Sequence, residues 1–204
     1  MTRKPLLRIA LTALLLMTTS AAANDSYQTH CAQCHGASGQ GNDALGAPNL
    51  TQLSAAYIQR QLEGFRAGWR KSDDSYTQTM IAAIASLDAP VLASATSAIE
   101  TFPAINRSPG AIQAGNTARG KDLYNAYCSA CHGTTGIGND ALGAPNLLGL
   151  SQNYLTRQYL HFAEGRRGGH PDDRSGQQMA RLAKALRDPQ LIDDVSTYVA
   201  SLAE

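Results

Sequence analysis

The chain has 204 residues, a length typical of one large domain or two small ones. Its 17 Lys and Arg side chains are almost balanced by 16 Asp and Glu, and they form no tract or basic face, which argues against nucleic-acid binding. Aromatic residues make up only 6% of the sequence, so two small domains would struggle to build their cores without a bound group.

The N-terminus has the features of an export signal. Basic residues at positions 3, 4 and 8 precede an apolar run over 9–17, and Ser20-Ala-Ala-Ala23 follows as a cleavage site. This order predicts a signal peptide over 1–23 and a periplasmic location. The run is shorter than the roughly 20 residues that span a bilayer, and no later run is longer. We therefore expect no membrane span after cleavage, the alternative being a retained anchor.

The rest of the chain is an internal duplication. The decapeptide Gly41–Leu50 returns letter for letter at Gly138–Leu147, 97 positions later. Met80 and Met179 then correspond at a spacing of 99, because the second copy gains two residues. A period of about 100 residues is too long for a solenoid repeat. It predicts two copies of one small domain, over 24–102 and 117–204, joined by a linker over 103–116.

Both copies predict the same helices. The apolar positions Ile58, Leu62 and Phe65 follow the spacing of one helix face, and no stretch alternates with period two, so we expect an all-α fold. The expected elements of each copy are a helix leading into its first cysteine (117–130 in the second copy, shorter in the first), a loop (36–50 or 133–147), a helix capped by Ser54 or Ser151 and ended by Gly68 or Gly165, a helix carrying Met80 or Met179, and a last helix starting at Pro90 or Pro189.

Each copy carries one Cys-x-x-Cys-His motif. The motifs are Cys31, Cys34 and His35 in the first copy, and Cys128, Cys131 and His132 in the second. Such a pair of thiols can hold zinc or form a disulfide, but a following His is typical of covalent haem attachment. The thiols add to the vinyl groups of one haem, and the His reaches its iron. All four cysteines of the chain are used, so we expect two covalently bound haem c groups.

The sixth iron position needs a second ligand. Met80 and Met179 are the only methionines after the predicted signal peptide, and each lies in the same context of its copy. A thioether ligand raises the reduction potential and fills the coordination sphere, which favours electron transfer over catalysis. The alternatives are that the methionines only fill the core, or that His30, His161 or His170 takes their place.

Several features of each copy, taken together, resemble those of class I cytochromes c. They are the attachment motif, the Gly-Asn loop, Pro-Asn-Leu, the helix with Tyr57, Leu62 and Phe65, a Gly-x-Arg segment and the late Met. Two tandem copies in an exported chain resemble the dihaem cytochrome c4 family. The resemblance implies two helical bundles, each wrapped around one haem, that face each other about a pseudo-twofold axis with the propionates near the interface.

The resemblance also implies roles for single residues. Pro48 and Pro145 would offer their carbonyls to the ligand histidines, and Leu50 and Leu147 would pack on the haem. Trp69 departs from the second copy, which has Arg166 there. It would either reach a propionate or pack as a partly buried side chain.

These features predict a periplasmic one-electron carrier of a respiratory chain, not an enzyme. By resemblance, it would work between a quinol-oxidising complex and a terminal oxidase or reductase. The alternative is the dihaem subunit of a periplasmic dehydrogenase, for example a flavocytochrome that oxidises reduced sulfur. A third possibility, a peroxidase, requires an iron with an open sixth position.

Overall fold

The computed structural model describes residues 23–105 and 115–202. The predicted signal peptide lies outside the described residues except for Ala23, and so does the central part of the predicted linker, 106–114. Within the described ranges the chain forms helices and loops, and no strand is longer than an isolated bridge. The expected all-α fold is confirmed.

The two domains repeat the same order of elements. In the first domain, residues 23–30 are helical and are followed by α2 (Ala32–His35), the short 3-10 helix η1 (Asp43–Leu45), α3 (Ala55–Arg66), α4 (Ser75–Ile84) and α5 (Ala89–Ile99). The second domain contains α6 (Thr117–Tyr127), α7 (Ser129–His132), η2 (Asp140–Leu142), α8 (Gln152–Ala163), α9 (Arg174–Ala183) and α10 (Pro189–Ser201).

The helix starts follow from local capping chemistry. The Ser54 hydroxyl accepts a hydrogen bond from the amide of Tyr57, and Ser151 does the same for Tyr154, each over 3.3 Å. These bonds satisfy amides that have no partner within the first turn. Asp88 and Asp188 cap α5 and α10, whose first turns carry the expected proline. The predicted starts of these helices are confirmed.

The structure differs from the prediction at the first helix of the second domain. We expected one helix over 117–130, but α6 ends at Tyr127 and α7 begins at Ser129. Cys128 lies between them with φ −114°, which opens the helical turn. Cys31 has the same geometry, with φ −118°. In both motifs the histidine at the end of the short helix that follows is buried.

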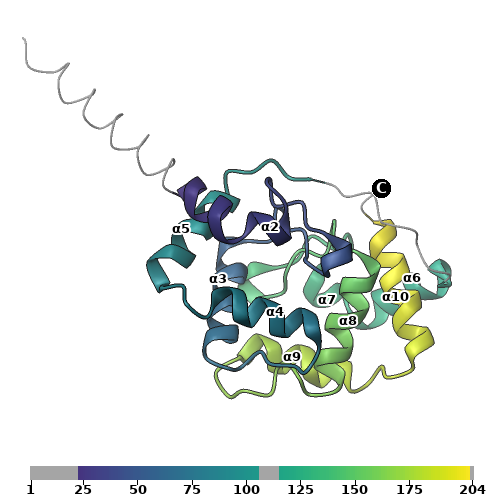
Figure 1. Ribbon diagram of the computed structural model, residues 1–204. Coiled ribbons are helices and arrows are strands. Elements are labelled where there is room, and N and C mark those ends of the chain that lie inside the picture. The colour runs from purple at the N-terminus through teal and green to yellow at the C-terminus, as the bar shows by residue number, and fades with distance from the viewer. Residues whose placement is uncertain (1–22, 106–114, 203–204) are drawn as a thin grey trace, which may run out of the picture.

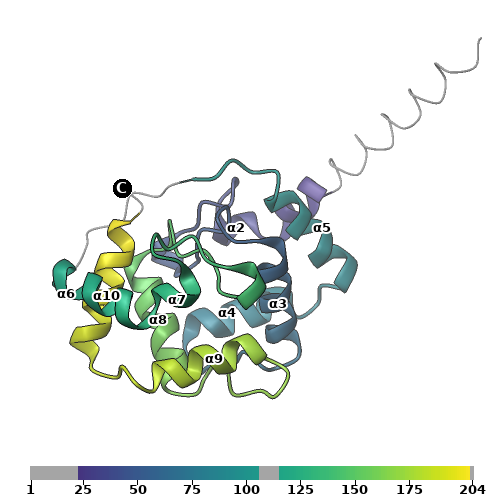
Figure 2. The ribbon, with the colours of Figure 1, turned by 180° about the vertical axis from the view of Figure 1, so that it is seen from behind.

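The two domains lie side by side. Figure 1 shows α5 at one end of the molecule, α6 and α10 at the other, and α3, α4, α8 and α9 between them; Figure 2 shows the same order from behind. In the second domain α6 packs across α10, and buried Tyr124 and Tyr198 contact each other in its core. The corresponding core of the first domain contains Tyr27, Ile58 and Ile99.

Among the described residues, no single helix has both the length and the apolar character needed to cross a membrane. Within the ranges that the structure describes, one pair of helices, α4 and α5, meets that test when taken together, and the pair is bent by 114° at its break.

The contact between α6 and α10 gives the first prediction. A Cβ on Gly120 would lie 2.0 Å from the backbone oxygen of Asp194, so Gly120→Ala must push the two helices apart. We expect a loss of about 1–3 kcal/mol in the free energy of unfolding, measured by denaturant titration of the haem-loaded protein. Gly64→Ala in α3 is the matched control, because its Cβ meets nothing closer than 3.5 Å. Equal stability of both variants would contradict this account.

Candidate haem sites

The two motif histidines are buried and held in one tautomer. His35 Nδ1 lies 3.1 Å from the Pro48 carbonyl oxygen, and His132 Nδ1 lies 3.0 Å from that of Pro145. Because a carbonyl oxygen only accepts, Nδ1 carries the proton and Nε2 keeps its lone pair. Burial lowers the pKa of both histidines. Each imidazole is therefore neutral at pH 7, which is the form that binds a metal.

The repeated decapeptide builds the loop that presents these carbonyls. The amide of Gly41 donates to the carbonyl of His35 over 2.7 Å, and Asn42 pairs with Ala47 through two backbone hydrogen bonds of 2.9 Å. Gly41 has φ +80°, and a Cβ there would lie 2.5 Å from the amide nitrogen of Asn49. Only glycine fits this close approach without strain. The loop over 138–147 has the same geometry, so each loop fixes the orientation of its histidine.

A buried tyrosine ties the end of each motif to the preceding helix. The Tyr27 hydroxyl donates to the Gly36 carbonyl over 2.7 Å, and Tyr124 donates to Gly133 over 2.6 Å. Burial raises the pKa of both phenols, so they stay protonated and keep donating. The two tyrosines lie 97 positions apart, the spacing of the duplication, but nothing in the sequence pattern indicated this bond.

The four cysteines form no disulfide with one another. Cys128 is buried, Cys131 is exposed, and Cys31 and Cys34 are half-buried. Burial, with a smaller effect of the neighbouring thiol, raises the pKa of Cys31 to about 11 and that of Cys128 to about 12. Each motif therefore presents two separate thiols beside one histidine.

The second domain contains a cavity of about 260 Å³ between its motif and α9. Cys128, Cys131, His132, Pro145 and Met179 all line it, together with a largely apolar wall that includes Leu147, Tyr159 and Phe162. An apolar cavity with two thiols, an unprotonated imidazole nitrogen and a thioether matches the donor set that covalent haem needs. In the first domain, half-buried Met80 packs against the cluster of Phe65, Ile84 and Leu92.

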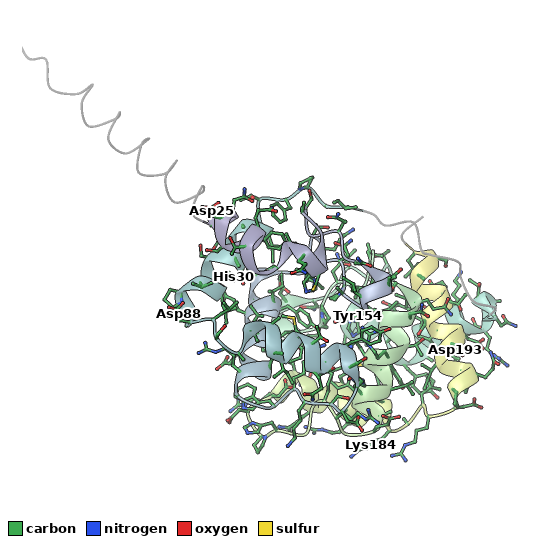
Figure 3. All side chains as sticks on the ribbon, viewed as in Figure 1. Asp25, His30, Asp88, Tyr154, Lys184 and Asp193 are labelled. Atoms are coloured by element: carbon green, nitrogen blue, oxygen red, sulfur yellow. The ribbon has the colours of Figure 1, made fainter. Side chains whose placement is uncertain are left out.

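The alternative histidine ligands lie elsewhere. Neither His161 nor His170 lines this cavity. His161 is buried with its Nε2 3.3 Å from a carboxylate oxygen of Asp74, in the other domain. The His170 ring stacks on Trp69 of the first domain, with centroids 4.9 Å apart. His30 is exposed on the first domain (Figure 3). Trp69 is thus a packing residue of the interface through this stack.

The interface between the domains contains two cations, a buried Arg167 and a half-buried Arg70. Arg70 and Arg167 both donate to the side-chain oxygens of Gln61 and Gln158, over 2.6–3.3 Å. Within 23–105 and 115–202, no ion pair involves either arginine. Buried cations without a counter-ion are costly, so this interface fits a group that brings carboxylates, as haem does with its propionates. No sequence pattern indicated the role of the two glutamines.

These observations define the class: a tandem cytochrome of the c type, with one haem site in each helical domain. The cytochrome c family model matches residues 20–86 and 117–203, and the chain belongs to the cytochrome c family. It carries two covalently bound haem c groups and is an electron-transfer protein rather than an enzyme.

Two similar proteins and one similar structure show which members of the family this chain resembles. The chain is 34% identical to a thiosulfate dehydrogenase electron acceptor of Stutzerimonas stutzeri, over 85% of this chain and 79% of that protein. It is 24% identical to a cytochrome c4 of Stutzerimonas stutzeri over 97% of this chain and 96% of that protein, which confirms the expected c4 resemblance. A thiosulfate dehydrogenase structure from Marichromatium purpuratum superposes with a TM-score of 0.73 at 28% identity, over 89% of this chain but only 40% of that one.

The contact between His161 and Asp74 predicts a pH dependence of stability. Burial lowers the pKa of His161 to about 4, although the Asp74 carboxylate opposes this shift. The unfolded chain therefore binds a proton on His161 more readily than the folded one, and stability falls as the pH drops from about 6.5 towards 4. Between pH 7 and pH 4, we expect the wild type to lose about 2–3 kcal/mol more of its unfolding free energy than His161→Gln.

The measurement is denaturant unfolding at a series of pH values. His30→Gln, at an exposed histidine, is the control and should keep the pH dependence of the wild type. An unchanged pH dependence in His161→Gln would show that the buried pair does not carry the effect.

Proposed function

We propose that each domain, with the boundaries 24–102 and 117–204, holds one haem through its own motif. Cys31 and Cys34 attach the first, and Cys128 and Cys131 the second. His35 with Met80, and His132 with Met179, are the axial ligands. The proposal is supported by the fixed Nδ1–H tautomer of both histidines and by the position of Met179 in the wall of the cavity.

This ligand set supports one-electron transfer. When bound, haem supplies an iron that cycles between Fe(III) and Fe(II). The histidine and methionine of each domain would occupy both axial positions, so the iron has no site for a substrate. The apolar wall of the cavity keeps water away, and the Pro48 and Pro145 carbonyls hold the imidazoles and raise their basicity.

We further propose that the protein is the periplasmic electron acceptor of a dehydrogenase that oxidises a reduced sulfur compound, with thiosulfate as the first candidate. The observation that carries this proposal is the 34% identity to a thiosulfate dehydrogenase electron acceptor, against 24% to cytochrome c4. The electrons would pass on to a terminal oxidase. The second candidate is a general respiratory carrier between a quinol-oxidising complex and a terminal oxidase or reductase, as first expected from the sequence.

The axial ligands are tested with Met80→His and Met179→His. Ligation of Fe(III) by methionine gives a weak absorption band at the far-red edge of the visible spectrum. We expect each single variant to lose half of this band and the double variant to lose all of it. Each single variant should also move one of the two redox transitions to lower potential, because methionine ligation raises the potential. A full band in either variant would exclude that methionine as a ligand.

The partner is tested by mixing the oxidised, haem-loaded protein with a purified thiosulfate dehydrogenase and thiosulfate in a stopped-flow spectrometer. We expect rapid reduction of both haems, and slower reduction when quinol and a quinol-oxidising complex replace the dehydrogenase. Cytochrome c4 of Stutzerimonas stutzeri is the matched control. The opposite order of rates would favour the general carrier.

A further inference from the structure

Each copy of the decapeptide loop is bound by an arginine of the other domain. Arg157 on α8 donates from Nη2 to the Gly46 carbonyl over 2.6 Å, and Arg60 on α3 donates to the Gly143 carbonyl over 2.8 Å. The two arginines occupy equivalent positions, and so do the two glycines. The contacts are therefore a reciprocal pair across the interface.

The bound carbonyls lie close to the second bond of the loop. Gly46 is two residues before Pro48, whose carbonyl accepts from His35. The pairing of Asn42 with Ala47 closes the loop between these points. Gly46 has φ +61° and Gly143 has φ +65°, a left-handed conformation that glycine adopts without strain. In this conformation each carbonyl contacts an arginine on a helix of the other domain. A cation of one domain thus holds the loop that orients the histidine of the other.

Arg60 also brings charge to the opposite site. Arg60, with Tyr57 and Gln61, belongs to the first domain but lines the cavity of the second. The Nε atoms of Arg60 and Arg157 are buried and have no hydrogen-bond partner. Charges interact strongly where water is excluded, and a nearby cation favours the state of a redox centre that has gained an electron.

The geometry points to a crosswise role for these two residues. We propose that Arg60 and Arg157 are positioning residues that raise the reduction potential of the haem held by the opposite domain: Arg60 acts on the second haem and Arg157 on the first. This inference rests on the proposed ligation by His35 and His132. It makes the potential of each haem depend on the docking of the other domain.

The two arginines are not held equally. The Arg157 guanidinium lies over the rings of Tyr154, on its own helix, and Tyr76, on α4, at 5.2 and 4.4 Å from their centroids. Tyr154 lies at the middle of the molecule in Figure 3. Arg60 lies over Tyr57 alone, at 5.2 Å, and Ser175 takes the place of the second ring beside Gly143. Arg157 is thus the more firmly fixed of the pair.

The test separates the two haems with the ligand variants. In a Met80→His background the first haem moves to low potential, so the remaining high-potential transition belongs to the second haem. We expect Arg60→Gln to lower this transition and Arg157→Gln to leave it in place. The Fe(II)/Fe(III) ratio at a fixed potential should fall about three- to tenfold, tenfold being about 59 mV for one electron. In a Met179→His background, the roles of the two arginines should be exchanged.

The controls separate charge from folding. Arg60→Lys and Arg157→Lys keep the charge and should restore most of the potential, whereas a purely structural role would not distinguish Lys from Gln. The other transition of each variant reports whether the protein is intact. A shift in the haem of the same domain, an equal shift in both, or no shift would overturn the proposal. If neither ligand variant moved a redox transition, the ligand assignment would be wrong. The crosswise effect would then be judged in the wild-type background, by whether Arg60→Gln and Arg157→Gln shift different transitions.

Discussion

The arrangement of the molecule depends on two like charges that are held side by side between its domains. Arg70 and Arg167 share the oxygens of Gln61 and Gln158, and each comes from a different domain. Burial, together with the charge of Arg167, lowers the pKa of Arg70. The two neutral amides accept two hydrogen bonds from each guanidinium, but they leave the buried Nε of Arg70 without a partner and do not cancel the charge. Haem propionates at this interface would, and docking of the domains and binding of the haems would then support each other.

Around this centre the interface combines symmetric and asymmetric contacts. The symmetric ones are those of Arg60 and Arg157 with the duplicated loops. The asymmetric ones gather where the copies differ: Asp73 pairs with Arg166, Asp74 with His161, and Trp69 stacks on His170. In each of these pairs at least one side chain has no identical counterpart in the other copy, and these contacts fix how the domains sit while the haem sites remain alike.

Much of the fold and the candidate site could be predicted from the sequence, because both depend on local patterns. Helix periodicity, capping residues and the attachment motif are properties of short stretches, and the duplication allowed Met80 and Met179 to be paired without a structure. The break in the helix at Cys128 was missed because it depends on one backbone angle that the residue type does not predict. The resemblance implied that the two domains face each other, but the side-chain contacts between them were missed, because periodicity shows which helix face is buried and not what covers it. Gln61 and Gln158 look like ordinary polar helix positions, and His161 and His170 looked like rival ligands until their partners in the first domain were placed.

We propose that protein ligands close both irons, so that the molecule carries electrons without chemistry at iron. Carbon monoxide binding to the fully reduced, haem-loaded protein tests it most directly, because this ligand needs a free axial position on Fe(II). We expect no change in the absorption spectrum of either haem when carbon monoxide is added at neutral pH. A spectral change that saturates at one or two equivalents per chain would contradict it.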